Sequence, residues 1–208
     1  MNPLKLNRMT LSPAIWQAIA PNGIRTHYDP MDSTSLIDQA DYKTGTISPT
    51  DADELRTIAE YFKPAVIAEV GTYIGRSTRA LAAGMKKGQI YTCDMSNNIN
   101  IGDTYGVWIE QFPKQTSTQM FHKLRERETK PDLFYIDGRL GDDDPASMAQ
   151  LNPDAVIVLD DFEGVEKGTF NAAVLLATEF TQSLLVYPRP GGKTALLVPY
   201  KMLQLVAQ

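Results

Sequence analysis

The chain has 208 residues, of which 43% are hydrophobic and 22% are charged, and its formal net charge is −5. This length and composition indicate one domain with a sizeable core and exclude disordered, collagen-like and low-complexity proteins. The negative charge argues against a nucleic-acid partner, and no apolar run approaches the roughly 20 residues that cross a bilayer. The single cysteine, Cys93, excludes an internal disulfide framework. The N-terminus lacks the continuous apolar stretch of a signal peptide, so we expect a cytoplasmic protein with neither nucleic-acid nor membrane partners.

The first 47 residues differ from the rest of the chain. Proline, asparagine and aspartate recur in this segment, and its hydrophobic residues follow no sustained helical or strand period. We interpret residues 1–47 as an irregular or partly helical N-terminal extension and residues 48–208 as the main domain. At the start of that domain, Ser48 and Pro49 are typical of a helix N-terminus, and Pro64 ends the predicted helix.

After this helix, short apolar runs alternate with helix-like segments. Strands are predicted at 65–70, 89–94, 107–112, 133–137 and 155–160, and helices at 77–85, 118–128 and 166–180. Runs at 183–187 and 195–198 flank a turn rich in proline and glycine, which predicts an antiparallel hairpin. Strands that are apolar throughout are typical of a parallel sheet with helices on both faces. We therefore predict an α/β, doubly wound, Rossmann-like fold.

Acidic residues stand at the carboxyl ends of four predicted strands. They are Glu69, Asp94, Asp137 and the pair Asp160 and Asp161. Ligands of parallel α/β sheets bind beyond these strand ends. One such acid is equally well explained as a cap for the following loop, but an acid at each of four strands indicates a binding site.

The turn after the first predicted strand, residues 71–75, has features of a ligand-binding loop. Gly71 permits a sharp turn, and Gly75 would let a ligand approach the backbone. Ser77 lies near the N-terminus of the next helix, whose free N–H groups attract a carboxylate. The Gly-x-x-x-Gly spacing differs from the dinucleotide fingerprint, whereas Asp94 is placed to accept hydrogen bonds from ribose hydroxyls. Together these features predict an adenosine-type ligand without a pyrophosphate.

In these motifs the sequence resembles the class I S-adenosylmethionine-dependent methyltransferases, and more narrowly the small O-methyltransferases related to catechol O-methyltransferase. The matching stretches are AEVGTYIGRST (68–78), YTCDM (91–95), TSTQMFHKL (116–124), DLFYIDG (132–138) and AVIVLDDFEG (155–164). They follow the family's order and cover roughly residues 44–200. The resemblance implies a seven-stranded, mostly parallel sheet with an antiparallel last strand. It also implies methyl transfer from S-adenosylmethionine to a hydroxyl of a small molecule.

The resemblance assigns cofactor contacts along the same strand ends. These contacts would be Glu69 and Gly71 at the methionine part, Tyr73 and Ser77 beside its carboxylate, Gly75 in the turn, Asp94 at the ribose, Met95 on the adenine, Ser117 at the adenine edge, and Asp137. All of them lie at or just after the carboxyl end of a predicted strand or at the start of a predicted helix, as a site at the edge of the sheet requires.

Three aspartates match the family's divalent-metal positions, Asp137, Asp160 and Asp161, the third of which is usually asparagine in the family. Carboxylate oxygens suit Mg²⁺, Mn²⁺ or Ca²⁺, and a bound metal would lower the pKa of a substrate hydroxyl. Alternatively, Asp160 and Asp161 merely order the loop before the next helix. The family commonly places a Lys or His base where this chain has Leu140. The catalytic base is therefore expected to be Asp137 or Asp161, unless a metal-bound hydroxyl needs none.

Several alternatives stay open at this point. The missing base at Leu140 also fits a non-catalytic protein that binds S-adenosylmethionine or a partner, and a nicotinamide-dependent dehydrogenase is disfavoured by the glycine spacing. Residues 142–144, three consecutive aspartates, are expected to form a mobile acidic loop at the mouth of the site. A homodimer through the N-terminal extension is expected. Five aromatic residues either line an acceptor pocket or pack the extension onto the core: Trp16, Tyr28, Tyr42, Tyr105 and Trp108.

Overall fold

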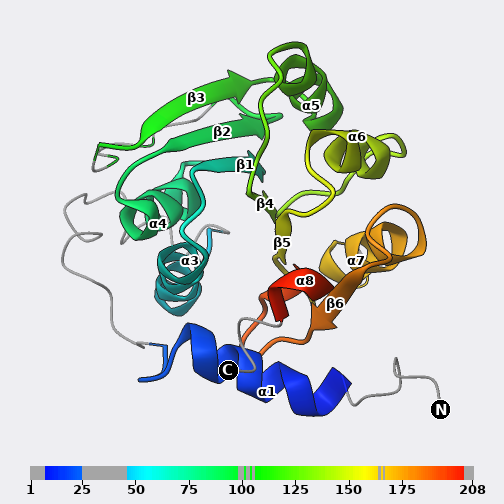
Figure 1. Ribbon diagram of the computed structural model, residues 1–208. Coiled ribbons are helices and arrows are strands. Elements are labelled where there is room, and N and C mark those ends of the chain that lie inside the picture. The colour runs from blue at the N-terminus through cyan, green and yellow to red at the C-terminus, as the bar shows by residue number, and fades with distance from the viewer. Residues whose placement is uncertain are drawn as a thin grey trace.

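A seven-stranded sheet runs through the centre of the molecule, and helices cover both of its faces (Figure 1). The computed structural model describes residues 8–24, 46–97, 101, 104, 106–163, 165 and 167–203. Its strands are β1 (Val66–Val70), β2 (Gln89–Asp94), β3 (Trp108–Pro113), β4 (Leu133–Ile136), β5 (Val156–Leu159), β6 (Ser183–Val186) and β7 (Ala195–Pro199). Their order in the sheet is β3-β2-β1-β4-β5-β7-β6. Among these strands, β7 alone runs in the direction opposite to the other six, which confirms the predicted fold class and the predicted hairpin.

The helices are α1 (Arg8–Ile19), α3 (Pro49–Phe62), α4 (Arg76–Met85), α5 (Ser117–Glu126), α6 (Asp144–Leu151), α7 (Gly168–Ala177) and α8 (Tyr200–Leu203). The start of α3 has the predicted chemistry, because the Ser48 hydroxyl accepts from the Asp51 N–H and the Asp51 carboxylate accepts from the Ser48 N–H. Helix α6 was not predicted from the sequence.

Two hydrophobic layers hold the helices on the sheet. One layer lies under α1, α3 and α4 and includes Leu55, Ile58 and Leu81. The other lies under α5, α6 and α7 and includes Phe121 and Leu175. Each of these five side chains is at most 1% exposed, and such burial stabilises a fold by roughly 1.5–3 kcal/mol per side chain. Helices therefore pack on both faces of the sheet, and this packing fixes the carboxyl ends of the strands relative to one another.

Helix α1 belongs to the same packed body as the sheet. The Trp16 indole N–H and the Ser12 hydroxyl both donate to the backbone carbonyl of Tyr187, at 2.7 and 3.1 Å. Trp16 is buried in the first hydrophobic layer. The domain boundary at residue 48 and the homodimer both stay predictions, and residues 25–45 lie outside the described residues. Within the described part of the chain, no helix combines the length and the apolar character that a membrane span requires.

Candidate functional site

The predicted strand-end acids lie along one edge of the sheet. Strands β2, β1, β4 and β5 are parallel neighbours, so their carboxyl ends meet at the same edge. Asp94 ends β2, and Asp137 and Asp160 directly follow β4 and β5. Glu69 precedes the last residue of β1. Parallel α/β sheets bind their ligands at this edge.

Glu69 is fully buried beneath the N-terminus of α4. The Ser77 and Thr78 hydroxyls each donate to one of its carboxylate oxygens, at 2.5 Å, and burial raises the pKa of this carboxyl. Glu69 thus joins the end of β1 to the first turn of α4. The Ser77 hydroxyl, expected beside the cofactor carboxylate, points to Glu69 in this structure, and the cofactor contacts of both residues stay predictions.

The turn between β1 and α4 depends on its two glycines. Gly71 and Gly75 adopt positive φ angles of 98° and 83°, which residues with a side chain rarely reach. A Cβ atom on Gly71 would lie 3.1 Å from the carbonyl oxygen of Asp137. The first glycine therefore lets this turn pass close to the chain that follows β4, and a narrow crevice forms between the two.

Asp94, at the end of β2, is hydrogen-bonded to the glycine turn. One of its carboxylate oxygens accepts from the Tyr73 N–H and the other from the Ser96 N–H, both at 2.6 Å. Each oxygen keeps a second lone pair, which is what a ribose hydroxyl would need. Met95, next in the chain, is 69% exposed and presents an apolar side chain for the adenine ring predicted to pack there.

Asp137 lies between two hollows. The crevice beside the glycine turn is lined by Gly71, Tyr73, Ser77 and Asp137 and has a volume of about 20 Å³. A second cavity, of about 340 Å³, is also lined by Asp137. Most of its wall is polar or charged: Thr46, Ser48, Thr50, Asp51, Asp160, Asp161, Lys167 and Lys193. A reaction between a ligand in the crevice and one in the cavity would take place next to Asp137.

The carboxylates around the cavity raise one another's pKa values. Burial, followed by the charge of Asp160, raises the pKa of Asp137 above its ordinary 3.8, although the Lys167 ammonium opposes this. Burial and the charge of Asp161 likewise raise the pKa of Asp160. The Tyr135 hydroxyl, buried below, donates to Asp160 at 3.1 Å. A carboxylate with a raised pKa is a stronger base than an exposed one.

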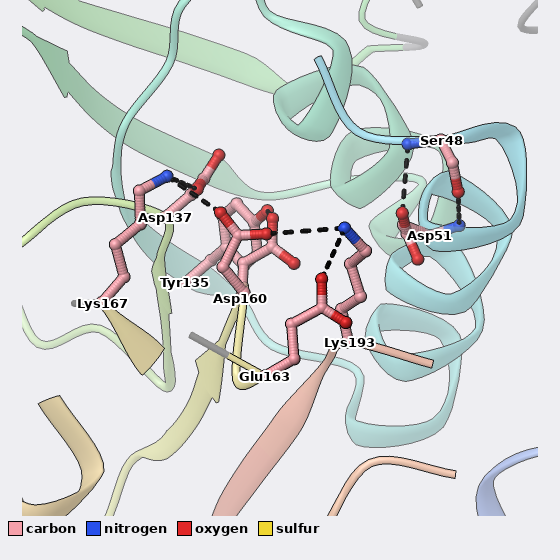
Figure 2. Close-up of polar contacts among 9 residues, drawn as sticks. Ser48, Asp51, Tyr135, Asp137, Asp160, Glu163, Lys167 and Lys193 are labelled. Atoms are coloured by element: carbon pink, nitrogen blue, oxygen red, sulfur yellow. Dashed lines mark hydrogen bonds and ion pairs between the residues drawn. The ribbon is translucent and has the colours of Figure 1, made fainter. Parts of the chain in front are cut away.

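Lys167 occupies the space between two of the three predicted metal ligands. Its ammonium nitrogen lies 3.1 Å from Asp137 Oδ1 and 3.0 Å from Asp161 Oδ2. Figure 2 shows the Lys167 side chain directed at Asp137. Within the described residues, no group of three or more His, Cys, Asp or Glu side chains is arranged to hold a metal ion. The arrangement of Asp137, Asp160 and Asp161 does not fit the predicted divalent metal, because a lysine ammonium already pairs with two of them. Sequence reasoning missed Lys167, which has no distinguishing spacing from these acids.

Ser117 has a different partner from the one predicted. Its hydroxyl donates to Asp144 at the start of α6, and the Thr118 hydroxyl and the Gly141 N–H donate to the same carboxylate. Asp144 is 0% exposed. The expectation of a mobile acidic loop over residues 142–144 is wrong for Asp144, because these hydrogen bonds fix it at the N-terminus of a helix. The adenine contact of Ser117 stays a prediction.

The residues around the missing base do not supply one. Leu140 is buried in the hydrophobic layer under α5–α7. The Arg139 guanidinium stacks over the Phe170 ring at 4.7 Å, and His122 lies exposed on α5 beside Glu126. His27 lies outside the described residues. The predicted bases Asp137 and Asp161 are, by contrast, both in the wall of the cavity.

Of the five aromatic residues, the structure describes Trp16 and Trp108. Trp16 lines a third hollow, of about 360 Å³, between α1 and residues 188–190, and it also packs the helix onto the core. Trp108 begins β3 at the opposite edge of the sheet and packs edge-on against Tyr91. Trp108 therefore does not line the candidate site. The three tyrosines at positions 28, 42 and 105 lie outside the described residues.

Comparison with known proteins gives structural matches but no sequence matches. No protein-family model matches the chain, and no curated protein matches it either. Among solved structures, an O-methyltransferase from Bacillus cereus in complex with SAH has 18% identity and a TM-score of 0.54, over 89% of this chain and 97% of that one. The O-methyltransferase TomG from Streptomyces achromogenes, involved in tomaymycin synthesis and in complex with SAM, has 18% identity and a TM-score of 0.57, over 89% and 96% of the two chains.

A third match agrees with these two in architecture. A methyltransferase from Geobacter sulfurreducens has 14% identity and a TM-score of 0.60, over 85% of this chain and 93% of that one. At sequence identities of 14–18%, these matches establish similarity of the backbone fold. Together with the strand order and the single antiparallel strand, it shows that this chain has the Rossmann-like fold of the S-adenosylmethionine-dependent O-methyltransferases.

Proposed function

We propose that this protein transfers a methyl group from S-adenosylmethionine to a hydroxyl oxygen of a small polar molecule. The observation that carries the proposal is the position of Asp137, which lines both the crevice beside the glycine turn and the larger polar cavity. The cofactor would lie in the crevice and the acceptor in the cavity. The matched O-methyltransferases, two of them bound to SAM or SAH, support this choice among the ligands that the fold can take.

The chemistry needs alignment and a base. A lone pair of the acceptor oxygen forms a bond to the methyl carbon, the carbon–sulfur bond breaks, and its electron pair stays on sulfur, which becomes a neutral thioether. The hydroxyl proton passes to the Asp137 carboxylate and later to water. Burial raises the pKa of Asp137, and a base with a pKa closer to neutrality accepts such a proton more readily. Asp161, 38% exposed on the same cavity, is the second candidate base.

Binding of the cofactor requires the crevice to widen. Its volume of about 20 Å³ is far below the roughly 300–1,000 Å³ of pockets that hold small ligands. Tyr73, in the turn that forms one wall, is 38% exposed and has a positive φ of 45°. We infer that this turn moves outward when the cofactor enters, while Asp94 keeps its place at the end of β2.

The cavity favours a hydrophilic acceptor. Thr46, Ser48, Thr50 and Asp51 line the cavity together with Lys167, and Figure 2 shows Ser48 and Asp51 on the side away from Lys167. Such a wall offers hydrogen bonds to several hydroxyls of one molecule, and apolar side chains are a minority in it. A polyhydroxylated acceptor is therefore expected to react better than a plain aromatic alcohol.

Calorimetric titration with S-adenosylmethionine and with its demethylated product tests the proposal. We expect micromolar binding of both to the wild-type protein and a loss of at least about tenfold in Asp94→Ala, because its carboxylate would hold the ribose. Asp154→Ala is the matched control, since Asp154 pairs with Lys201 on the surface. NAD serves as the competing ligand.

Each outcome has a definite meaning. No binding of either methionine compound by the folded protein would refute the proposal, and binding of NAD instead would favour a dehydrogenase. Binding without methyl transfer to a panel of polyols, sugars and catechols would favour the non-catalytic alternative that the buried Leu140 leaves open.

A further inference from the structure

The side chain of Lys167 places a positive charge inside the candidate site. Lys167 lies immediately before α7, whose first residue is Gly168, and its side chain reaches back to the strand ends, where Asp137 follows β4 and Asp161 follows β5. Its nitrogen is almost equally distant from Asp137 Oδ1 and Asp161 Oδ2, at 3.1 and 3.0 Å. Both distances are those of hydrogen-bonded ion pairs.

The negative charge at this point requires a counterion. Asp137, Asp160 and Asp161 all line one cavity, and three carboxylates in so small a space repel one another. In the fold family these positions are associated with a divalent metal. Here the ammonium of Lys167 pairs with two of the three, and the third, Asp160, accepts from the buried Tyr135 hydroxyl. The chain's own groups therefore offset part of this negative charge.

We propose that Lys167 takes the place of the divalent metal: its ammonium holds the acceptor oxygen, and the site excludes Mg²⁺ and Mn²⁺. This inference rests on the proposed function. A lysine ammonium has three N–H donors, and the described residues account for two of them through Asp137 and Asp161. The third is left for an acceptor oxygen in the same cavity.

The exclusion of metal follows from the shared oxygens. Mg²⁺ binds carboxylate oxygens at about 2.0–2.1 Å, and an ion on Asp137 Oδ1 and Asp161 Oδ2 would share both atoms with the ammonium. Two cations on the same pair of oxygens repel each other. Lys167 would have to leave before a metal could bind.

The step remains balanced with the lysine in this role. The ammonium keeps its three protons throughout and donates a hydrogen bond to the acceptor oxygen. The hydroxyl proton leaves to a carboxylate, the oxygen forms its bond to the methyl carbon, and sulfur keeps the electron pair of the broken bond. The lysine is neither base nor nucleophile.

A second lysine on the same cavity provides a matched control. Lys193 lies 2.9 Å from Glu163 but 4.0 Å from Asp161, and Figure 2 shows it on the opposite side of the aspartates from Lys167. Removing Lys193 changes the net charge of the cavity by the same amount, but it leaves the Asp137–Lys167–Asp161 bridge intact.

The test measures Mn²⁺ binding to the purified proteins by calorimetry and by the electron paramagnetic resonance signal of free Mn²⁺. Lys167→Met keeps much of the side chain's length without its charge, and its position is 43% exposed, so folding is expected to survive. We expect no saturable Mn²⁺ binding by the wild type or by Lys193→Met. In Lys167→Met we expect one saturable Mn²⁺ site, with an affinity at least about tenfold above the weakest that the titration of the wild type would detect. The double variant Lys167→Met, Asp161→Asn should lose this Mn²⁺ site.

Two results would overturn the inference. One is a single Mn²⁺ site in the wild type that Asp161→Asn removes, and the other is a Lys167→Met protein that binds Mn²⁺ no better than the wild type. Titration with S-adenosylmethionine on the same samples separates this test from that of the proposed function. A wild type that binds both the cofactor and Mn²⁺ refutes only the role of Lys167, whereas failure to bind the cofactor refutes the methyltransferase proposal itself.

Discussion

Glu54, on α3, is an acid that the fold buries at a cost. Its side chain is 0% exposed, and its ion-pair partner, Arg189 Nε, lies 3.5 Å from Oε1. Among the described residues, neither carboxylate oxygen has a hydrogen-bond partner. Burial raises the pKa of Glu54 from 4.5 to about 7, although the charge of Arg189 opposes this. We predict that Glu54→Gln stabilises the protein more at pH 8 than at pH 5.

The magnitude follows from the two pKa values. The unfolded chain loses this proton near pH 4.5 and the folded chain near pH 7, so the folded state binds more protons between these values and its stability falls as the pH rises. The full effect is about 3.4 kcal/mol at ~1.36 kcal/mol for each tenfold change. Roughly 2.5 kcal/mol of it develops between pH 5 and pH 8. Glutamine cannot titrate, so the stability of the variant relative to the wild type should rise by that amount.

Urea unfolding at pH 5, 6.5 and 8, followed by tryptophan fluorescence, measures this difference. Any constant effect of leaving Arg189 without its partner cancels when the two pH values are compared. Glu60→Gln is the control, because Glu60 lies on the same helix but is 41% exposed and pairs with Lys86. A stability difference between Glu54→Gln and wild type that is the same at pH 5 and pH 8 would refute the reasoning.

Two further variants test the frame of the site. Asp144→Asn should lower the free energy of unfolding by about 2–3 kcal/mol, because the buried carboxylate accepts hydrogen bonds from two hydroxyls and a backbone N–H. Urea unfolding measures this change. Asp142→Asn is the control, because Asp142 is exposed and its substitution should change the free energy of unfolding little. Gly75→Ala should cost about 1–3 kcal/mol and weaken binding of S-adenosylmethionine, because φ is 83° and the new Cβ would lie 2.7 Å from Ile101 Cγ1. Unchanged stability and unchanged calorimetric affinity in this variant would contradict the role given to the turn.

Most of the strands were predictable because they are short apolar runs bounded by glycine, proline or an acid. Even β3, with Trp108 and Glu110 in an edge strand, pairs with β2 as expected. Helix α6 was not predictable in the same way, because it begins with Asp144 and Pro145 after two more aspartates, a composition typical of a loop. The fixed position of Asp144 comes from Ser117 and Thr118 hydroxyls on another helix, and such contacts are invisible in a local pattern.

The site shows the same difference between features set by a local sequence pattern and features set by contacts between distant residues. The common location of Asp94, Asp137 and Asp160 follows from parallel strands and could be predicted without coordinates. The contact of Lys167 with Asp137 joins residues 30 positions apart and depends on how the chain turns after β5, where Asp161 adopts a positive φ of 49°. No spacing rule relates a lysine after such a turn to an acid on a neighbouring strand. For this reason the sequence predicted the acids and missed their counterion.

The hydrogen bonds from α1 to Tyr187 have a consequence for biosynthesis. Trp16 and the carbonyl that it contacts are 171 positions apart, so α1 cannot dock until the ribosome has added about that many residues after it. The loop that follows Tyr187 also supplies Lys193 to the polar cavity. During translation, the apolar side chains Ile15, Trp16 and Ile19 therefore have no final packing partner on β6 until Ser183–Val186 emerges. A nascent protein that exposes an apolar helix for this long is expected to bind chaperones.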